Sequence, residues 1–468
     1  MSNPTLQAAI AAHRFGLGEA RLDAVSPDPQ AWLLGQIGPA DAPRGDGLLG
    51  TRAALAHVAA EKEQRKLAKN PPPGQAADTA AEQVLAGHYR EVTLADARSR
   101  FATAAATHRP FAERLQLFWA NHFTVSLAKG SARGLVGAFE RDAIRPNIAG
   151  SFEALLLAST THPAMLRYLD NNQSAGPNSR IVARAARRAA RNDDTARITG
   201  LNENLAREVL ELHTLGVTGG YTQADVTAFA RVLTGWRLGV QDTDASQPFD
   251  ADWHEPGRKT VLGKTYAEGP DALRQVLHDL ARHPSTANFI ATKLARHFVA
   301  DTPPPALVER LAATYQRSDG QLAEVYRTLV RSPEAWEPQA AKLKTPEEFV
   351  VSTVRVLGSG ERAVVGKETR GDDGRALQAL GQRVHAAPSP AGWSDKADDW
   401  LGPDAVWKRV EWATRVADRV GSGIDARGLA EQSFGPWLTD TTRQQIERAA
   451  DGPQALALLL MAPEFQRR

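Results

Sequence analysis

Apolar residues recur at spacings of three and four along nearly every long segment of this chain, and this periodicity restricts the possible fold more than any other feature. Clear examples are residues 111–123 (FAERLQLFWANHF), 151–159 (SFEALLLAS) and 287–301 (ANFIATKLARHFVAD). Such spacing collects the apolar side chains on one face of an α-helix. The chain is therefore predicted to be mostly helical.

Proline follows the end of an apolar helical run at four places and opens the next helix. Pro163, Pro284, Pro333 and Pro463 each stand at such a junction. Proline suits the first turn of a helix because the N–H that it lacks would have no partner there. Since the junctions are unevenly spaced, they indicate helix hairpins and not a fixed-period repeat. The prediction is an all-α fold in which residues 1–468 form one large domain.

Residues 248–266 (PFDADWHEPGRKTVLGKTY) are the one stretch that looks extended. Short β-compatible runs flank a His-Glu-Pro-Gly sequence, which predicts a small β-hairpin with His254 and Glu255 at its turn. In one interpretation this pair is simply exposed. In the other, it reaches the helix of residues 202–216 as a lid or as a base.

Residues 173–200 form a basic insertion that contains six arginines and two aspartates. This composition favours an exposed, solvated helix or loop. The alternative is an amphipathic arm that binds nucleic acid or anionic lipid, but aromatic residues are almost absent from the segment.

The overall composition excludes several classes of function. The chain has no cysteine, so disulfides, thiolate nucleophiles and cysteine-ligated metal centres are excluded. Lys plus Arg total 56 against 54 Asp plus Glu, which argues against a dedicated nucleic-acid-binding protein. No run of about 18 uncharged apolar residues occurs, so no membrane-spanning segment is predicted. The N-terminus lacks the pattern of a signal peptide, which predicts a cytoplasmic protein.

The segment 202–216 (NENLAREVLELHTLG) concentrates polar side chains on a single helix. Asn202 is placed to cap this helix, Glu203 lies at its positive end, and Arg207 stands four residues from both Glu203 and Glu211. A capped helix with surface ion pairs would explain these residues. If the helix belongs to a binding site instead, Asn202, Glu203, Asn204 and Arg207 are the candidate ligand contacts.

The same helix places Asn204, Glu208 and Glu211 at the border of its apolar stripe. Carboxylates at the edge of a core need hydrogen-bonding partners or a metal ion. His213 lies on the other side of the helix from Glu208, so the two cannot ligate one ion from within this helix. Two interpretations stay open: a binding or catalytic site, or a buried ionic network that holds helices together.

Two other positions are candidates for chemistry. His122 follows Leu115, Phe118 and Trp119 at helical spacing, so it is either a core histidine or a ligand or base. Asp170 begins an Asp-Asn-Asn cluster, which is typical of turns and caps but also offers oxygen ligands for a divalent metal.

The histidines before two of the helix-opening prolines have a simpler interpretation. His162 and His283 occupy the position just before a helix, where a structural role is expected.

Seven segments carry a resemblance to a known family. In chain order they are RLQLFWANHFTVS, HPAMLRYLDNNQS, NENLAREVLELHTLGVTGGYTQADVTAFARVLTGW, WHEPGRKTVLG, HPSTANFIATKLARHFVAD, LKTPEEFVVSTVRVLG and PSPAGWSD. With these segments the chain resembles the bacterial domain of unknown function 1800 family over nearly its whole length. The resemblance implies no established activity.

The resemblance also implies a context for the protein. Genes of this family often stand beside those of sulfatase-like proteins, and many members look exported. Two features depart from the family pattern. Here the RFGLG motif begins close to Met1, and the Arg-rich segment 173–200 lengthens a connection that is commonly shorter.

Two hypotheses of function follow. In the first, Glu208 and Glu211 form a polar cleft with His122, Asp170 and His254, which holds a divalent metal and activates water for hydrolysis. In the second, the polar helix is purely structural, and the protein is an accessory partner of a sulfatase-like protein that it binds through a surface groove.

Overall fold

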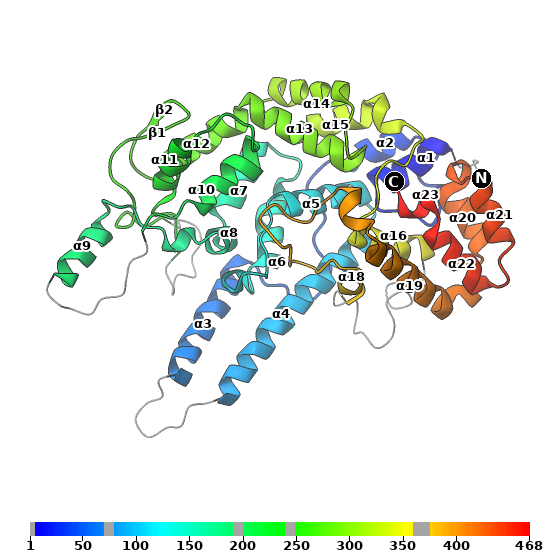
Figure 1. Cartoon of the computed structure of the whole chain (residues 1–468), viewed down its shortest axis with the longest axis horizontal. Coiled ribbons are helices and arrows are strands. Elements are labelled where there is room, and N and C mark those ends of the chain that lie inside the picture. Colours follow the sequence, from blue (N-terminus) through cyan, green and yellow to red (C-terminus); the bar gives the residue numbers. More distant parts are fainter. Residues whose placement is uncertain (1–4, 70–78, 191–199, 239–248, 359–374) are drawn as a thin grey trace.

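The computed structural model of the chain is built almost entirely of helices (Figure 1). It describes residues 5–69, 79–190, 200–238, 249–358 and 375–468. The first helices in chain order are α1 (Leu6–Ile10), α2 (Pro29–Leu34), α3 (Thr51–Lys69), α4 (Thr79–Ala106), α5 (Pro110–His122), α6 (Val136–Phe139) and α7 (Phe152–Thr161). The next are α8 (Pro163–Tyr168), α9 (Arg180–Ala189), α10 (Asn204–Glu208), α11 (Gln223–Leu233), α12 (Asp271–Arg282), α13 (Pro284–Phe298) and α14 (Pro305–Arg317). The last are α15 (Leu322–Arg331), α16 (Pro346–Leu357), α18 (Arg375–Ala379), α19 (Pro403–Val420), α20 (Ala426–Phe434), α21 (Asp440–Glu447), α22 (Gly452–Met461) and α23 (Pro463–Gln466).

The predicted helical fold is confirmed, and so are the helix junctions at proline. Pro163, Pro284 and Pro463 are the first residues of α8, α13 and α23. Pro333 opens a short 3-10 turn, Pro333–Trp336. The N–H groups in the first turn of a helix have no acceptor within the helix, so the N–H that each proline lacks costs no hydrogen bond there.

The two histidines that precede these helices act as caps, as expected. His162 Nδ1 accepts a hydrogen bond from the Ala164 N–H, and His283 Nδ1 accepts one from the Ser285 N–H, each at 3.1 Å. Both imidazoles therefore satisfy a backbone donor that the first helical turn leaves free.

Two main hydrophobic cores lie on either side of α5. The larger core includes Phe111 and Trp119 of α5 with side chains of α7 and α10 to α15, and the smaller one includes Leu117 of α5 with side chains of α16, α19, α20 and α22. Trp119 also donates a 2.6 Å hydrogen bond to the Tyr326 hydroxyl. Helix α5 is thereby fixed in the middle of the molecule, and its last residue, His122, packs against Phe123 and Phe152 of the larger core.

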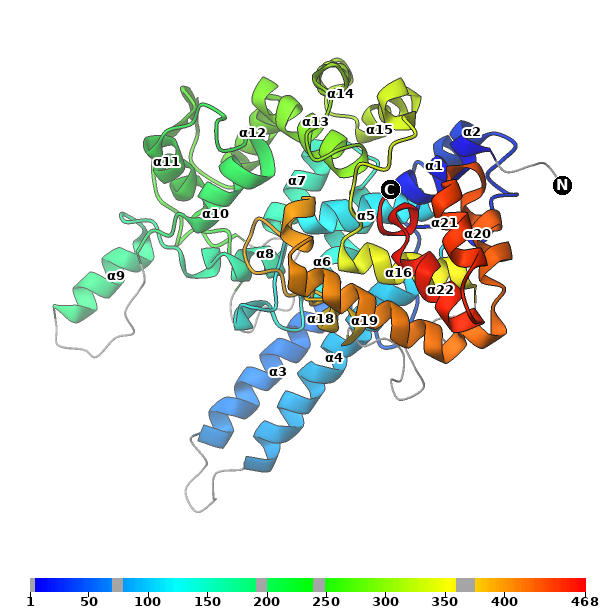
Figure 2. The ribbon, with the colours of Figure 1, turned by 45° about the vertical axis from the view of Figure 1, so that its right-hand side comes forward.

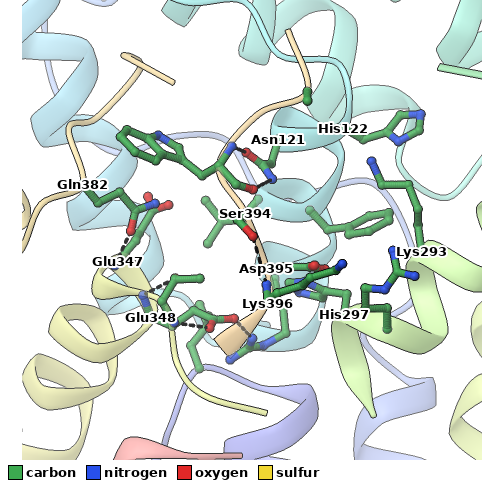
Figure 3. A pocket seen from close by; sticks show the side chains of 18 of the residues that line it. Asn121, His122, Lys293, His297, Glu347, Glu348, Gln382, Ser394, Asp395 and Lys396 are labelled. Atoms are coloured by element: carbon green, nitrogen blue, oxygen red, sulfur yellow. Dashed lines mark hydrogen bonds and ion pairs between the residues drawn. The ribbon is translucent and has the colours of Figure 1, made fainter. Parts of the chain in front are cut away.

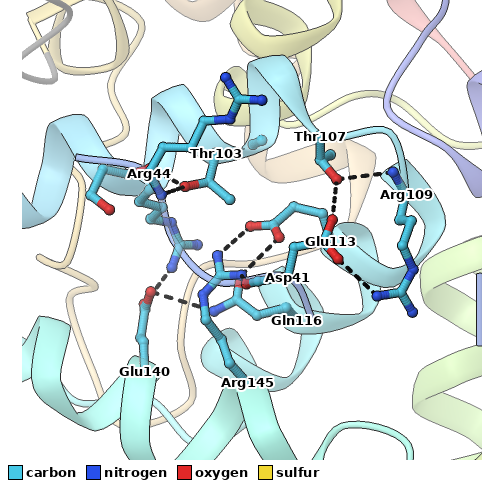
Figure 4. Close-up of polar contacts among 12 residues, drawn as sticks. Asp41, Arg44, Thr103, Thr107, Arg109, Glu113, Gln116, Glu140 and Arg145 are labelled. Atoms are coloured by element: carbon cyan, nitrogen blue, oxygen red, sulfur yellow. Dashed lines mark hydrogen bonds and ion pairs between the residues drawn. The ribbon is translucent and has the colours of Figure 1, made fainter. Parts of the chain in front are cut away.

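A buried ion-pair network ties α5 to the segment that follows α6. Arg145 donates hydrogen bonds of 2.9 and 2.5 Å to the two carboxylate oxygens of Glu113 (Figure 4). The same guanidinium donates to the Asp41 carbonyl, and the Asp41 carboxylate pairs with Arg109 at 2.8 Å. Because both members of the Glu113–Arg145 pair are buried, each depends on the other for its hydrogen bonds.

Two helical parts stand away from this body (Figures 1 and 2). Helices α3 and α4 run side by side as a long hairpin, and α9 projects separately. No residue of α9 is buried, and Arg184 pairs with Asp252 at 2.5 Å. The expectation of an exposed, solvated helix is confirmed for this part of the basic insertion. In the described parts of the chain, no helix is long and apolar enough to cross a membrane.

The predicted β-hairpin is present, but its turn is not where the sequence placed it. Strands β1 (Lys259–Val261) and β2 (Lys264–Tyr266) pair antiparallel, with Lys259 opposite Tyr266. The turn falls at Leu262 and Gly263, which both have positive φ. His254 and Glu255 precede the hairpin and are only 5% and 6% exposed. The expectation of an exposed His-Glu turn is therefore wrong.

The reason is a set of hydrogen bonds that the local sequence does not reveal. Lys259 Nζ lies 3.0 Å from His254 Nε2, while His254 Nδ1 lies 2.6 Å from the Thr234 carbonyl. Asn178 donates two hydrogen bonds to the Glu255 carboxylate. These partners, distant in sequence, make it possible to bury both polar side chains.

Candidate functional site

A cavity of about 220 Å³ opens between α5, α13, the start of α16 and the loop of residues 391–396 (Figure 3). The polar and charged side chains that line it come from distant parts of the chain. They are Arg100 of α4, Arg114, Asn121 and His122 of α5, Lys293, Arg296 and His297 of α13, Thr345, Glu347 and Glu348 at the start of α16, Gln382, and Ser394, Asp395 and Lys396 of the loop. We call this cavity the charged pocket.

Helix α13 supplies the wall of the charged pocket. Arg296 and His297 stand three and four residues after Lys293, so each lies beside Lys293 on one face of the helix. Ile290 and Leu294 of the same helix are fully buried in the larger core. This packing fixes the helix and turns its polar face to the cavity.

The loop 391–396 is held over the charged pocket by backbone hydrogen bonds. Asn121 Oδ1 accepts from the Trp393 N–H and Asn121 Nδ2 donates to the Trp393 carbonyl, both at 2.8 Å. Asp301 accepts from the Ala397 N–H at 2.9 Å, and Lys342 donates to the Asp395 carbonyl. The position of Asp395 and Lys396 is thus set by contacts that the loop makes with α5 and with the end of α13.

Replacing Gly392 by alanine is expected to displace this loop. Gly392 has a φ of +85°, and a Cβ there would lie 2.5 Å from the Asn121 carbonyl oxygen. Steric strain of this kind costs about 1–3 kcal/mol, so urea unfolding should show a loss of that size. Alanine at Gly423, where a Cβ would meet nothing within 4 Å, is the matched control. Equal effects of the two substitutions would contradict the tight docking of the loop.

The glutamates of the charged pocket already have cationic partners. Glu348 binds Arg114 and, at 2.9 Å, Arg468. Glu347 pairs with Arg100 at 2.7 Å. These two carboxylates are therefore neutralised by arginines and do not offset further cations in the cavity.

Three other cationic groups at the charged pocket lack such partners. In the part of the chain that the structure describes, no hydrogen bond or ion pair engages the ammonium of half-buried Lys293 or of exposed Lys396. Arg296 uses only its Nε, which donates to the Asp301 carbonyl at 3.2 Å. Asp395 is the one lining carboxylate without an arginine, and its oxygen lies 4.0 Å from His297 Nδ1. The cavity therefore has an excess of positive charge.

Burial alters the protonation of the pocket side chains. It lowers the pKa of Lys293 to about 8, with nearby Arg296 acting in the same direction and Asp395 opposing them. It also holds the pKa of His122 and of His297 well below the ordinary value, so both imidazoles are neutral. Among the described residues, His122 Nδ1 and His297 Nε2 have no hydrogen-bond partner. Each is a polar atom that a ligand or water could satisfy.

Of the residues selected from the sequence, His122 lies at the charged pocket and the helix of residues 202–216 does not. Asn202 Oδ1 accepts a hydrogen bond from the Asn204 N–H at 2.9 Å, and Glu203 lies 3.4 Å from Arg207. The expected ion pair is present, whereas the N-cap position of α10 is Glu203, and Asn202, one residue earlier, binds the first helical N–H. Asn204 is exposed.

Helix α10 changes its geometry after Glu208. Residues Val209–Thr214 form a π-helix, in which the Leu215 N–H donates to the Leu210 carbonyl. The wider turn rotates the following residues, so His213 is buried while the apolar Leu212 is only half-buried. A regular helical period could not predict this change of face.

Of the candidate carboxylates, Glu208 and Glu211 lie close enough to interact, and Asp170 has a different partner. Glu208 is half-buried, and burial followed by the negative charge of Glu211 raises its pKa. Glu211 interacts with the Tyr221 hydroxyl. Asp170 forms an ion pair with Lys129. Within the described ranges, no three histidine, aspartate or glutamate side chains are grouped so that they could hold a metal ion.

A comparison with models of protein families identifies the family of this chain. The model of the family described as protein of unknown function (DUF1800) matches residues 10–467. The chain belongs to the DUF1800 family. No curated protein and no solved structure matches this DUF1800 chain. Its charged pocket lies where four of the seven resembling segments meet, those at residues 114–126, 283–301, 343–358 and 388–395.

Sequence reasoning did not select Lys293, Arg296, Glu348 or Lys396. Lys293 and Arg296 lie on the polar face of an amphipathic helix, where charged residues are usually solvated. Only the convergence of α13 with the 391–396 loop shows that this face lines a cavity. The available signal was the presence of both segments among those that resemble the family.

Proposed function

We propose that the charged pocket binds a small oxyanion, a carboxylate or a phosphate. In this proposal the protein binds a small molecule in a cavity, as an enzyme binds its substrate. The observation that carries this proposal is the trio of cationic groups, Lys293, Arg296 and Lys396, which outnumber Asp395, the one carboxylate among the described residues lining the cavity that no arginine neutralises. Ionised donors in a partly dehydrated site form strong hydrogen bonds to oxyanions.

The trio offers different kinds of contact to a ligand. The terminal nitrogens of Arg296 can bind two oxygens of a carboxylate or phosphate in parallel. Lys396, which is exposed, would attract the anion at the rim, whereas half-buried Lys293 would contact it inside the cavity. A volume of about 220 Å³ limits the ligand to a small molecule.

Replacing Arg296 by glutamine is expected to weaken oxyanion binding about 10- to 100-fold, the usual effect of losing a charge-assisted hydrogen bond. Titration calorimetry at fixed ionic strength with phosphate, acetate and succinate measures it. Glutamine at Arg310, an exposed arginine paired with Glu334 on another surface, is the matched control. If the Arg296 variant binds as well as the Arg310 variant, the proposal fails.

A second candidate function is metal-assisted hydrolysis at Glu208 and Glu211. The raised pKa of Glu208 next to Glu211 favours it, because carboxylates in such an environment can act as acid and base. A divalent cation held by two carboxylates would take its other ligands from substrate and water. His122, Asp170 and His254 then have no place in that site.

Glutamine at Glu208 separates the two interpretations of this helix. A hydrolytic site predicts loss of bound metal and of turnover, measured by metal analysis and a phosphodiester and ester screen, while the circular dichroism spectrum stays the same. A structural helix predicts metal content and turnover equal to wild type.

A third candidate is an accessory role beside a sulfatase-like protein, as the family context implies. An exposed apolar cluster at the start of α19 favours it: Trp407 is 66% exposed and is accompanied by Leu401 and Val406. Serine at Trp407 should then abolish co-elution with a sulfatase-like protein of the kind whose genes often stand beside those of this family. Absence of co-elution with wild type would exclude this role.

A further inference from the structure

Lys293 differs from the other shielded lysines of the molecule. Lys259 donates to the Glu255 carbonyl, Lys342 to Asp301 and to the Asp395 carbonyl, and Lys344 to the Ser352 hydroxyl at 3.2 Å. Each of these ammonium groups has a hydrogen-bond acceptor, although burial also lowers the pKa of Lys259 and of Lys344. Lys293 has no such acceptor within the described chain.

Lys293 lies among aromatic rings and two charged groups, Asp395, which raises its pKa, and Arg296, which lowers it. Its Nζ lies 5.6 Å from the centre of the Phe289 ring, one helical turn earlier on α13. Phe118 and the neutral imidazole of His122 line the same cavity. The Phe289 contact favours the ammonium, but burial outweighs it and lowers the pKa of Lys293 to about 8, which leaves a neutral fraction near neutral pH. A neutral amine is a nucleophile.

We propose that Lys293 condenses with the carbonyl group of a small 2-oxo acid to form an imine. This inference rests on the proposed oxyanion site, because Arg296 and Lys396 would hold the carboxylate and so place the adjacent carbonyl carbon at Nζ. The C–N bond forms as Nζ attacks that carbon, and the carbonyl oxygen leaves as water with both amine hydrogens. No oxidant, reductant or metal enters this balance.

Reductive trapping tests the imine directly on the full chain. The protein is incubated with pyruvate and sodium cyanoborohydride, and the adduct is located by intact mass and peptide mapping. A single major adduct on Lys293 is expected, at least 10-fold above that on Lys408, an exposed lysine of α19. Acetate, which has the carboxylate but no carbonyl, should compete with the trapping.

Variants and pH give independent checks. Arginine or methionine at Lys293 should remove the major adduct, and arginine at Lys408 should leave it unchanged. Trapping should increase as the pH rises from 6 to 8, because the neutral amine becomes more abundant. Equal labelling of Lys293 and Lys408 in wild type would overturn the imine, whether or not a Lys293 variant folds.

The outcome also distinguishes the two proposals. If calorimetry detects phosphate or acetate binding that depends on Arg296 but pyruvate gives no adduct on Lys293, the imine is wrong and the oxyanion site stands. If neither oxyanion binding nor trapping occurs, both proposals are wrong.

Discussion

Replacing Glu348 by alanine is expected to destabilise the fold by about 3–5 kcal/mol. This buried carboxylate accepts from the Thr345 N–H at 2.9 Å in the capping box of α16, and it neutralises Arg114 and Arg468. Those cations hold the pKa of Glu348 far below its usual range. Without it, two guanidiniums would remain buried together with no carboxylate between them.

Urea unfolding followed by circular dichroism measures this effect. The matched control is alanine at Glu411, whose exposed pair with Arg415 spans 3.6 Å. Exposed pairs contribute about 0–1 kcal/mol, so the control should change little. A Glu348 variant as stable as the Glu411 variant would contradict the ion network behind the charged pocket.

Acidification from pH 7 to pH 5 is expected to lower the free energy of unfolding by several kcal/mol. Burial lowers the pKa of His13 and His213 to about 3 and that of His162 to about 4. In the unfolded chain these groups titrate near 6.5. The unfolded state therefore binds more protons below pH 6.5, and stability falls as the pH falls from there towards 4.

Each of these histidines accounts for about 2 kcal/mol at pH 5 by this linkage. Leucine at His213 tests the assignment, because neither nitrogen of His213 has a hydrogen-bond partner among the described residues. The variant should lose less stability than wild type between pH 7 and pH 5 in chemical unfolding. The same loss in both proteins would show that carboxylates, and not buried histidines, control acid unfolding.

The helical fold could be predicted because its signals are local. The spacing of apolar residues in 111–123 predicts the helix α5, although its polar face is buried as well, and the prolines at 163, 284 and 463 determine where helices begin. The caps at His162 and His283 follow from the same local rule.

The candidate site could not be predicted because it depends on contacts distant in sequence. Nothing in the sequence distinguishes Lys293 and Lys396 from solvated surface lysines. They line the same cavity because Asn121 and Asp301 hold the 391–396 loop in place by hydrogen bonds. The buried position of His254 likewise depends on distant partners. The sequence drew attention to residues 202–216 because many polar residues lie close together there. The excess of positive charge in a cavity depends instead on whether each cation has a carboxylate partner, which the number of polar residues in one segment does not reveal.

The most direct measurement is anomalous diffraction from crystals of the full chain soaked in selenate, a tetrahedral oxyanion. The strongest selenium peak is expected in the charged pocket, within hydrogen-bond distance of Arg296 and of Lys293 or Lys396. Ordered selenate bound elsewhere on the protein, with the charged pocket open to solvent and empty of selenium, would contradict an oxyanion site there.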